Sequence, residues 1–116
     1  MLRFRPCAEK EGCAAYQAEL DSVKCGTCDF DWSGYQMFFR SVSCEDDIVT
    51  EGLLRSAMNY CANRGVYTST ITPDMLSPAA RRLGFTEDEL TVDIPDALTS
   101  TECGCMKKAE NSNKPE

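Results

Sequence analysis

The chain has 116 residues with eight cysteines, no histidine and a formal net charge of −7. This length suits a single domain, and the negative charge argues against a nucleic-acid partner because it repels a phosphate backbone. The lack of histidine excludes Ser-His-Asp and Cys-His catalysis, as well as zinc sites with imidazole ligands. No segment approaches the roughly 18–20 apolar residues of a membrane span.

The first forty residues predict two helices. Good helix formers follow Pro6, and apolar residues recur at spacings of three and four, which predicts a helix over 8–22. The segment "SGYQMFFRSVSC" predicts a second, short helix, whose apolar stripe is expected at the centre of the core. That stripe consists of Tyr35, Phe38, Phe39 and Val42.

A third helix is predicted between 43 and 65. Ser43 is a possible N-cap, and the acids Asp46 and Asp47 suit the positive end of the helix dipole better than they suit a pair of catalytic carboxylates. Gly65 can adopt the left-handed conformation that ends the helix. The predicted apolar face comprises Val49, Leu53, Ala57, Tyr60 and Cys61.

Two short strands are predicted in the last third. The segment "VYTSTI" is rich in β-branched residues, and "LTVDI" alternates apolar and polar positions, so the two could pair as a ribbon. Between them, "TPDML" and "SPAARRLG" show the cap-then-proline pattern of helix starts. The predicted fold is therefore mainly α: a small disulfide-stapled helical domain over 1–106 with a minor two-stranded β-ribbon, followed by a disordered C-terminal tail over 107–116.

The segment "KCGTCDFDWSG" is open to several interpretations. Cys25 and Cys28 have the spacing of a redox dithiol, but that motif usually sits in a βαβ context that is not predicted here. With Cys103 and Cys105 they could supply four thiolates to a structural zinc ion. A calcium loop beginning at Asp29 is disfavoured, because its twelfth position is Arg40, where a bidentate glutamate is required.

A disulfide framework accounts for all the cysteines together. An even number of cysteines in a short chain is typical of secreted domains that disulfides stabilise. Eight cysteines allow 105 pairings, and the sequence leaves the connectivity open. The predicted framework comprises Cys7, Cys13, Cys25, Cys28, Cys44, Cys61, Cys103 and Cys105.

The segment "CDFDWSGYQMFFRSVSCEDDIVTEGLLRSAMNYCANRGV" resembles the small secreted cysteine-rich proteins of fungi. In domains of the CFEM kind, a short aromatic helix, a cysteine and a helix that ends in Cys-Ala-x-x-Gly follow one another. The resemblance implies a secreted protein of the effector class. It does not imply haem binding, because the haem-ligating aspartate of that family has no secure counterpart here. The matching residues are Phe38, Phe39, Cys44, Cys61, Ala62 and Gly65.

These observations predict a secreted, extracellular, non-enzymatic protein that acts by recognising a protein or cell-surface partner, in the manner of a fungal virulence effector. Tyr67, Arg81 and Arg82 are the candidate interaction surface, because the earlier helices are expected to supply the core. No catalytic residue, cofactor or bound metal is predicted. The alternative function is an intracellular zinc adaptor that uses Cys25, Cys28, Cys103 and Cys105. Oxidised or free cysteine thiols distinguish the two.

Overall fold

The computed structural model describes residues 1–99. Four long strands precede a long helix, and short elements follow it. In chain order the elements are β1 (Leu2–Lys10), β2 (Cys13–Leu20), β3 (Val23–Ser33), β4 (Gln36–Cys44), α1 (Asp47–Ala62), β5 (Thr68–Thr70), the 3₁₀ turn η1 (Pro73–Met75), α2 (Pro78–Arg82) and β6 (Thr91–Asp93). Residues 94–99 are also helical.

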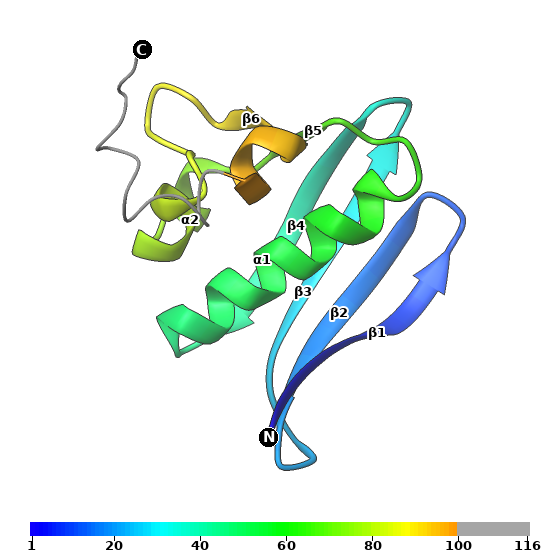
Figure 1. The fold of residues 1–116 in the computed structure, drawn as a ribbon, viewed down its shortest axis with the longest axis vertical. Coiled ribbons are helices and arrows are strands. Elements are labelled where there is room, and N and C mark those ends of the chain that lie inside the picture. Colours follow the sequence, from blue (N-terminus) through cyan, green and yellow to red (C-terminus); the bar gives the residue numbers. More distant parts are fainter. Residues whose placement is uncertain (100–116) are drawn as a thin grey trace.

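The strands form one mixed sheet in the order β1-β2-β3-β4-β5-β6. All neighbours are antiparallel except β4 and β5, which run parallel and are connected through α1. Helix α1 lies across one face of the long strands, α2 packs beside α1, and the helix at 94–99 lies close to β6 (Figure 1). The predicted mainly α fold class is therefore wrong.

The predicted helix over 8–22 is a β-hairpin. β1 and β2 pair antiparallel across a turn at Gly12, which has a φ of +81° that favours glycine. Along β2 the core-facing positions follow the two-residue period of a strand, since Ala14 and Ala18 are buried and Tyr16 is half-buried. Pairing with neighbouring strands outweighs the helical propensity of this alanine-rich segment.

The predicted aromatic helix is strand β4. Its buried positions are Met37 and Phe39, again two residues apart, whereas Tyr35 precedes the strand and is 70% exposed. The helical spacing of the aromatic residues is therefore coincidental. Their size and stiffness suit the half-buried surface of a sheet equally well.

Helix α1 confirms the third predicted helix, with a later start. Its N-cap is Asp46, and Gly65 beyond its end has a φ of +85°. The predicted apolar face is correct, since Leu53, Ala57 and Cys61 are fully buried.

The short elements at the end of the described chain were also predicted. β5 and β6 pair antiparallel as a ribbon, but the ribbon extends the large sheet through β4. Helix α2 begins at Pro78, and the Ser77 hydroxyl accepts a hydrogen bond from the Ala80 amide at 3.1 Å. The predicted tail over 107–116 lies outside the described residues.

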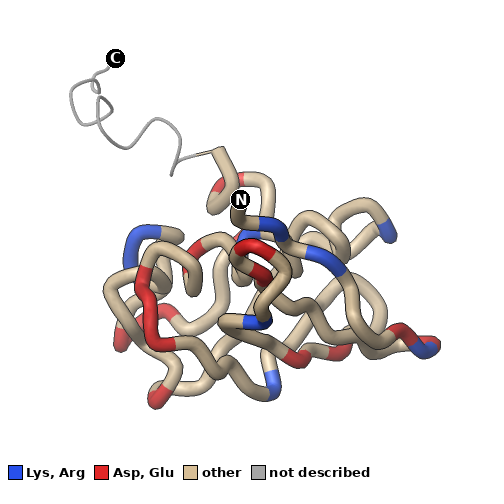
Figure 2. Tube along the Cα trace, turned by 90° about the horizontal axis from the view of Figure 1, so that it is seen from below, with Lys and Arg blue, Asp and Glu red and all other residues tan. Residues whose placement is uncertain are grey.

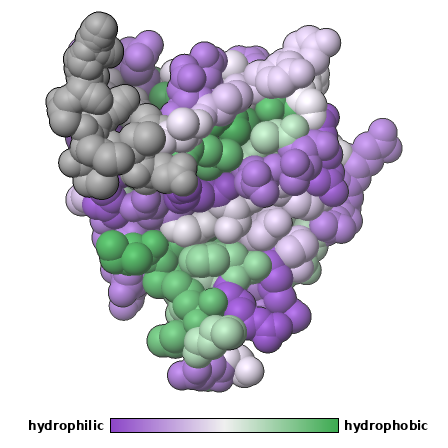
Figure 3. Space-filling model, in the orientation of Figure 1, coloured by the Kyte–Doolittle hydropathy of each residue, from purple (hydrophilic) through white to green (hydrophobic). Residues whose placement is uncertain are grey.

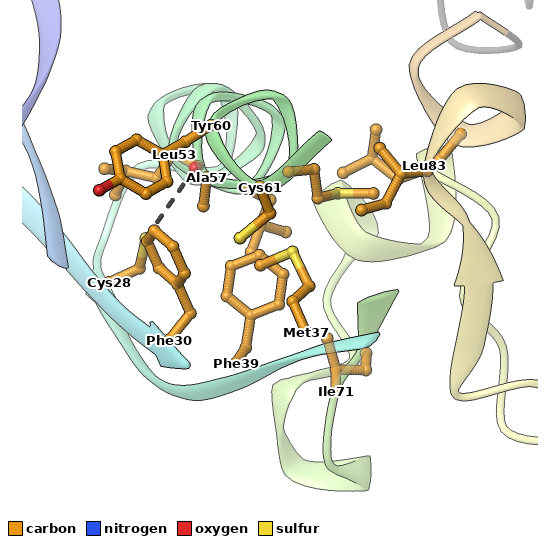
Figure 4. Close-up of a cluster of buried hydrophobic side chains, with 14 of the residues drawn as sticks. Cys28, Phe30, Met37, Phe39, Leu53, Ala57, Tyr60, Cys61, Ile71 and Leu83 are labelled. Carbon is orange, nitrogen blue, oxygen red and sulfur yellow. Dashed lines mark hydrogen bonds between the residues drawn. The ribbon is translucent and has the colours of Figure 1, made fainter. Parts of the chain in front are cut away.

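The core lies between α1 and the sheet, and it contains two cysteines as apolar side chains. Figure 4 shows Cys28 from the sheet and Cys61 from α1 pointing inward among aromatic rings. The Cys28 thiol lies 3.9 Å from the Leu53 carbonyl oxygen, and burial raises the pKa of both thiols to about 12. These two cysteines fill the core as small hydrophobic residues.

The predicted disulfide framework is wrong for the cysteines that the structure describes. Cys28 and Cys61 are buried thiols, and Cys7 and Cys25 are exposed ones. The disulfides were expected to stabilise a small helical domain. The sheet and the long helix packed on it form a hydrophobic core instead. Cys103 and Cys105 lie outside the described residues. The free thiols at 1–99 are Cys7, Cys13, Cys25, Cys28, Cys44 and Cys61.

Apolar side chains are exposed at the end of the sheet where the chain begins. Leu2 pairs with Leu20 and Leu20 with Val23 across β1, β2 and β3, and these three residues are 37%, 52% and 67% exposed. This end lies beyond the reach of α1 in Figure 1, and apolar residues gather at the same end in Figure 3. Among residues 1–99, no helix is both long and apolar enough to cross a membrane.

Candidate functional site

The candidate site begins where the two parallel strands diverge. β4 and β5 pair over only three positions, from Gln36 opposite Thr68 to Phe38 opposite Thr70. Phe39 of β4 pairs with Phe30 of β3, whereas the next paired residue, Ser41, is opposite Asp29. Arg40 is therefore an extra residue on β4. A bulge of this kind bends its strand, and it follows directly on the stretch of β4 whose pairing stops where β5 itself ends, at Thr70.

The rest of β4 has one unpaired edge. From residue 39 to residue 44 the strand bonds to β3, but no described strand continues along its other side. Alternate residues of a strand direct their N–H and C=O groups to opposite edges. Backbone donors and acceptors of this stretch therefore face away from β3 and are available to an extended ligand.

This open edge lines a cleft of about 460 Å³. One wall is the end of β4 with the loop to α1 and the first turn of α1, and the opposite wall is the segment 74–77 before α2. Val42, Met75 and Leu76 give the cleft apolar surface. The full lining is Arg40, Ser41, Val42, Cys44, Glu45, Asp47, Thr50, Asp74, Met75, Leu76 and Ser77.

The cleft is acidic. Glu45, Asp47 and Asp74 line it, whereas its one basic residue, Arg40, is held by Asp31 with its Nε 2.8 Å from the carboxylate. A hydrogen bond from the Thr72 hydroxyl, at 2.6 Å, lowers the pKa of Asp74 further below neutral pH. Acidic residues outnumber basic ones in the whole sequence, 19 to 12, and Figure 2 shows both kinds spread over the coloured part of the trace.

The N-terminus of α1 at the cleft is occupied by its own cap. The Asp46 carboxylate accepts hydrogen bonds from the amides of Ile48 at 2.9 Å and Val49 at 3.1 Å. These amides are the donors with which a helix commonly binds a phosphate. The sequence interpretation of Asp46 as a helix-start charge is confirmed, and the cap leaves these two donors satisfied.

Asp47 connects the two walls of the cleft. Its Oδ1 accepts a hydrogen bond from the Ala79 amide at 3.0 Å, and its Oδ2 lies 2.6 Å from Arg82. Arg82 also pairs with Glu51 at 2.7 Å, and these two partners raise the pKa of its guanidinium. The first turn of α1 and helix α2 are thereby held together beside the cleft.

The predicted interaction residues lie on two different elements. Tyr67 precedes β5 and stacks on Tyr35 with ring centroids 5.5 Å apart, and it is 55% exposed. Arg81 and Arg82 end α2, where Arg81 pairs with Glu87 at 2.9 Å. Their role as a recognition surface stays a prediction.

The described residues of the predicted zinc site do not converge. Cys28 is fully buried, whereas Cys25 is exposed at an irregularity in β3. No group of three or more potential ligands within 1–99 could hold a metal ion. Cys103 and Cys105 lie outside the described residues. The redox dithiol and the calcium loop have no structural basis either. Cys25 and Cys28 lie within strand β3, and the calcium-loop segment forms the β3–β4 hairpin, in which Asp31 is bound to Arg40.

Sequence reasoning missed the open edge of β4, since it interpreted that segment as a helix. The acidic residues after β4 were noticed, but their position at a cleft depends on strand pairing. One local signal was available. The Thr-Pro and Ser-Pro pairs correctly predicted the starts of η1 and α2, and the second wall of the cleft, 74–77, lies just before α2.

Several solved structures of similar fold are acetyltransferases. The ribosomal-protein-S18-alanine N-acetyltransferase of Escherichia coli has a TM-score of 0.58 and 14% identity, over 74% of this chain and 72% of that one. The aminoglycoside 6'-acetyltransferase type Ii has a TM-score of 0.56 and 16% identity, over 65% of this chain and 56% of its own. A GNAT family acetyltransferase from Elizabethkingia anophelis with acetyl-CoA bound has a TM-score of 0.51 and 11% identity, over 60% and 63%. The chain thus spans less than two thirds of the length of the last two.

Acetyl-CoA, present in one of these structures, fits the cleft only in part. The open edge of β4 and the apolar wall suit its amide-bearing arm and thioester. A diphosphate placed at the start of α1 would meet two amides that Asp46 already binds, with the carboxylates of Glu45 and Asp47 beside them. No lysine lines the cleft.

These likenesses correct the functional prediction. No protein-family model and no curated protein sequence matches the chain, and the solved structures of this fold are acetyltransferases rather than CFEM-like proteins. The resemblance to fungal effectors and the prediction of a disulfide-stapled, non-enzymatic recognition protein are therefore wrong. The extracellular location stays a prediction. The chain shares its fold with these acetyltransferases over 60–74% of its length.

Proposed function

We propose that this protein transfers an acyl group from a thioester to a cationic amine, with the reaction taking place in the cleft between β4 and the segment 74–77. The observation that carries the proposal is the open, unpaired edge of β4 at that cleft. An amide-bearing thioester arm can extend along such an edge by the same hydrogen bonds that add a strand to a sheet. The acetyltransferase fold supports the assignment of acyl-transfer chemistry.

The charge of the cleft supports an amine as the acceptor. Carboxylates at Glu45, Asp47 and Asp74 favour an ammonium group over a neutral or anionic one. Two of the acetyltransferases with this fold are named for an alanine of a ribosomal protein and for aminoglycosides. An acceptor of this chain is then an amine that is protonated in water and loses its proton in the cleft.

In the reaction, the neutral amine attacks the thioester carbonyl, the C–N bond forms, and the C–S bond breaks. Before the attack the ammonium releases one proton to solvent. During transfer a second N–H proton passes to a base and from it to the departing sulfur, which leaves as a thiol. Glu45 is a carboxylate on the cleft wall whose side chain is exposed and can accept such a proton. Backbone N–H groups along the β4 edge can polarise the thioester carbonyl.

The test is thiol release from acetyl-pantetheine, acetyl-CoA and acetyl-N-acetylcysteamine in the presence of a peptide with a free N-terminus. We expect release above the hydrolysis rate together with acetylated peptide by mass, and no release when the peptide is already N-acetylated. Leu76→Trp, which fills the cleft, should abolish the reaction, whereas Thr91→Trp on the exposed β6 should not. Failure with every donor and amine, or full activity of folded Leu76→Trp, would reject the proposal.

A further inference from the structure

The cleft suits the amide-bearing arm of acetyl-CoA better than its diphosphate. This difference indicates which part of a thioester donor the cleft can bind. The open edge of β4 at 39–44 and the apolar residues Val42, Met75 and Leu76 can hold an amide-bearing arm. The diphosphate would have to lie among carboxylates. The contributions of the arm and of the diphosphate to binding can be measured separately with donors that lack the diphosphate.

We propose that the donor is an acyl thioester of pantetheine or a shorter amide-bearing thiol, and that the acidic rim of the cleft excludes coenzyme A. The rim is defined as the lining residues Glu45, Asp47 and Asp74 together with Asp46, the N-cap of α1 between Glu45 and Asp47 in the chain. This inference rests on the proposed function, because it names the donor class for the same cleft.

The start of α1 already has an anionic ligand from its own chain. A helix N-terminus binds a phosphate through its free amides, but the Asp46 carboxylate already accepts from Ile48 and Val49. A diphosphate would have to displace that carboxylate and lie beside it. The backbone amides that would bind the phosphate are therefore already hydrogen-bonded to Asp46.

Among the described residues, the cleft also has no uncommitted positive charge with which to bind a diphosphate. Arg40, the one basic residue of the cleft lining, is bound to Asp31. Arg82 beside the rim is held by both Asp47 and Glu51. Phosphate sites usually rely on arginine or lysine that can turn toward the anion, and here both guanidiniums already serve carboxylates.

The amide-bearing arm needs neither the amides at the start of α1 nor the two arginines. Its amides can bond to the backbone of β4, and its methylene groups can lie on Leu76 and Met75. Removing the diphosphate leaves these contacts unchanged and removes the repulsion. A pantetheine thioester consequently satisfies the cleft better than the complete coenzyme does.

The experiment measures binding and turnover separately on the full chain. Dissociation constants for pantetheine, 4′-phosphopantetheine and coenzyme A are measured by calorimetry at low and high salt. We expect pantetheine to bind at least tenfold more tightly than coenzyme A, with phosphopantetheine between them, and the gap to narrow as salt screens the rim.

A charge-neutralised variant provides the control. Asp74→Asn keeps the Asp46 cap and the Glu45 carboxylate, and it should strengthen coenzyme A binding several-fold with at most a twofold effect on pantetheine binding. Asp88→Asn removes the same charge at an exposed position outside the cleft lining and should change neither dissociation constant. Equal or tighter binding of coenzyme A by the native chain would overturn the donor assignment while acyl transfer remained measurable. Absence of turnover with every donor would instead reject the proposed function.

Discussion

Gly26 of β3 lies so close to Cys44 of β4 that a Cβ at position 26 would come within 2.9 Å of the Cys44 Sγ. It would also come within 3.1 Å of Leu53 on α1. The lack of a side chain at Gly26 therefore lets the end of β4 and the helix approach the sheet closely. This contact positions the strand end that lines the cleft.

Gly26→Ala should lower the free energy of unfolding by about 1–3 kcal/mol, because the added methyl overfills a packed junction. The measurement is urea unfolding followed by circular dichroism. Gly26→Ala combined with Cys44→Ala should recover part of the loss. Val23→Ala on the same strand, at a 67% exposed position, should change stability by less than about 0.5 kcal/mol. A neutral Gly26→Ala would show that the strand end is not packed as described.

The Asp46 cap should contribute measurably to stability. Asp46→Ala removes the acceptor for the Ile48 and Val49 amides and should cost about 0.5–2 kcal/mol. Asp46→Asn keeps a side-chain oxygen and should cost much less. The same unfolding experiment distinguishes them, with Glu45→Gln as the adjacent control. Equal stability of Asp46→Ala and the native chain would contradict the cap.

Asp47 should control the local stability of α2. Asp47→Ala removes the acceptor for the Ala79 amide and one partner of Arg82, so the wall of the cleft should open more often. Hydrogen exchange at Ala79 and Ala80 should accelerate at least severalfold, while exchange within β2 stays constant. The control is Glu87→Gln, which weakens only the exposed pair with Arg81. Unchanged exchange at Ala79 would contradict this link.

The buried thiols predict a loss of stability at alkaline pH. Burial raises the pKa of Cys28 and Cys61 from 9.0 to about 12, so the unfolded chain releases these protons at lower pH than the folded one. Between pH 9 and 12 the unfolded state therefore binds fewer protons, and the free energy of unfolding falls as the pH rises. Cys61→Ala should lessen this fall. A slope identical to that of the native chain would contradict a protected thiol at position 61.

The sequence predicted the elements whose signals are local. The face of α1, its left-handed stop at Gly65 and the Ser77 cap of α2 depend on neighbours within a few residues. The first four strands depend on pairing instead: β2 is rich in alanine and β3 contains glycine, neither of which favours a strand by itself. Cysteine counting then supported the wrong fold, because the described thiols serve as core or surface residues.

The candidate site was beyond sequence reasoning for a related reason. Its geometry arises from an extra residue at Arg40 and from the short pairing of β4 with β5. Both are properties of register between segments that are far apart in the chain. The acidic residues Asp46 and Asp47 were correctly interpreted as a helix start, but their effect on a ligand follows only from the cleft beside them.

The central claim is that the open edge of β4 binds an amide-bearing thioester arm. The most direct measurement is the change in backbone amide chemical shifts when pantetheine is added to the ¹⁵N-labelled protein. The account predicts shifts concentrated at residues 39–47 and 74–77, with β1 and β2 unaffected. Saturable shifts confined to other surfaces, or none at millimolar pantetheine, would contradict it.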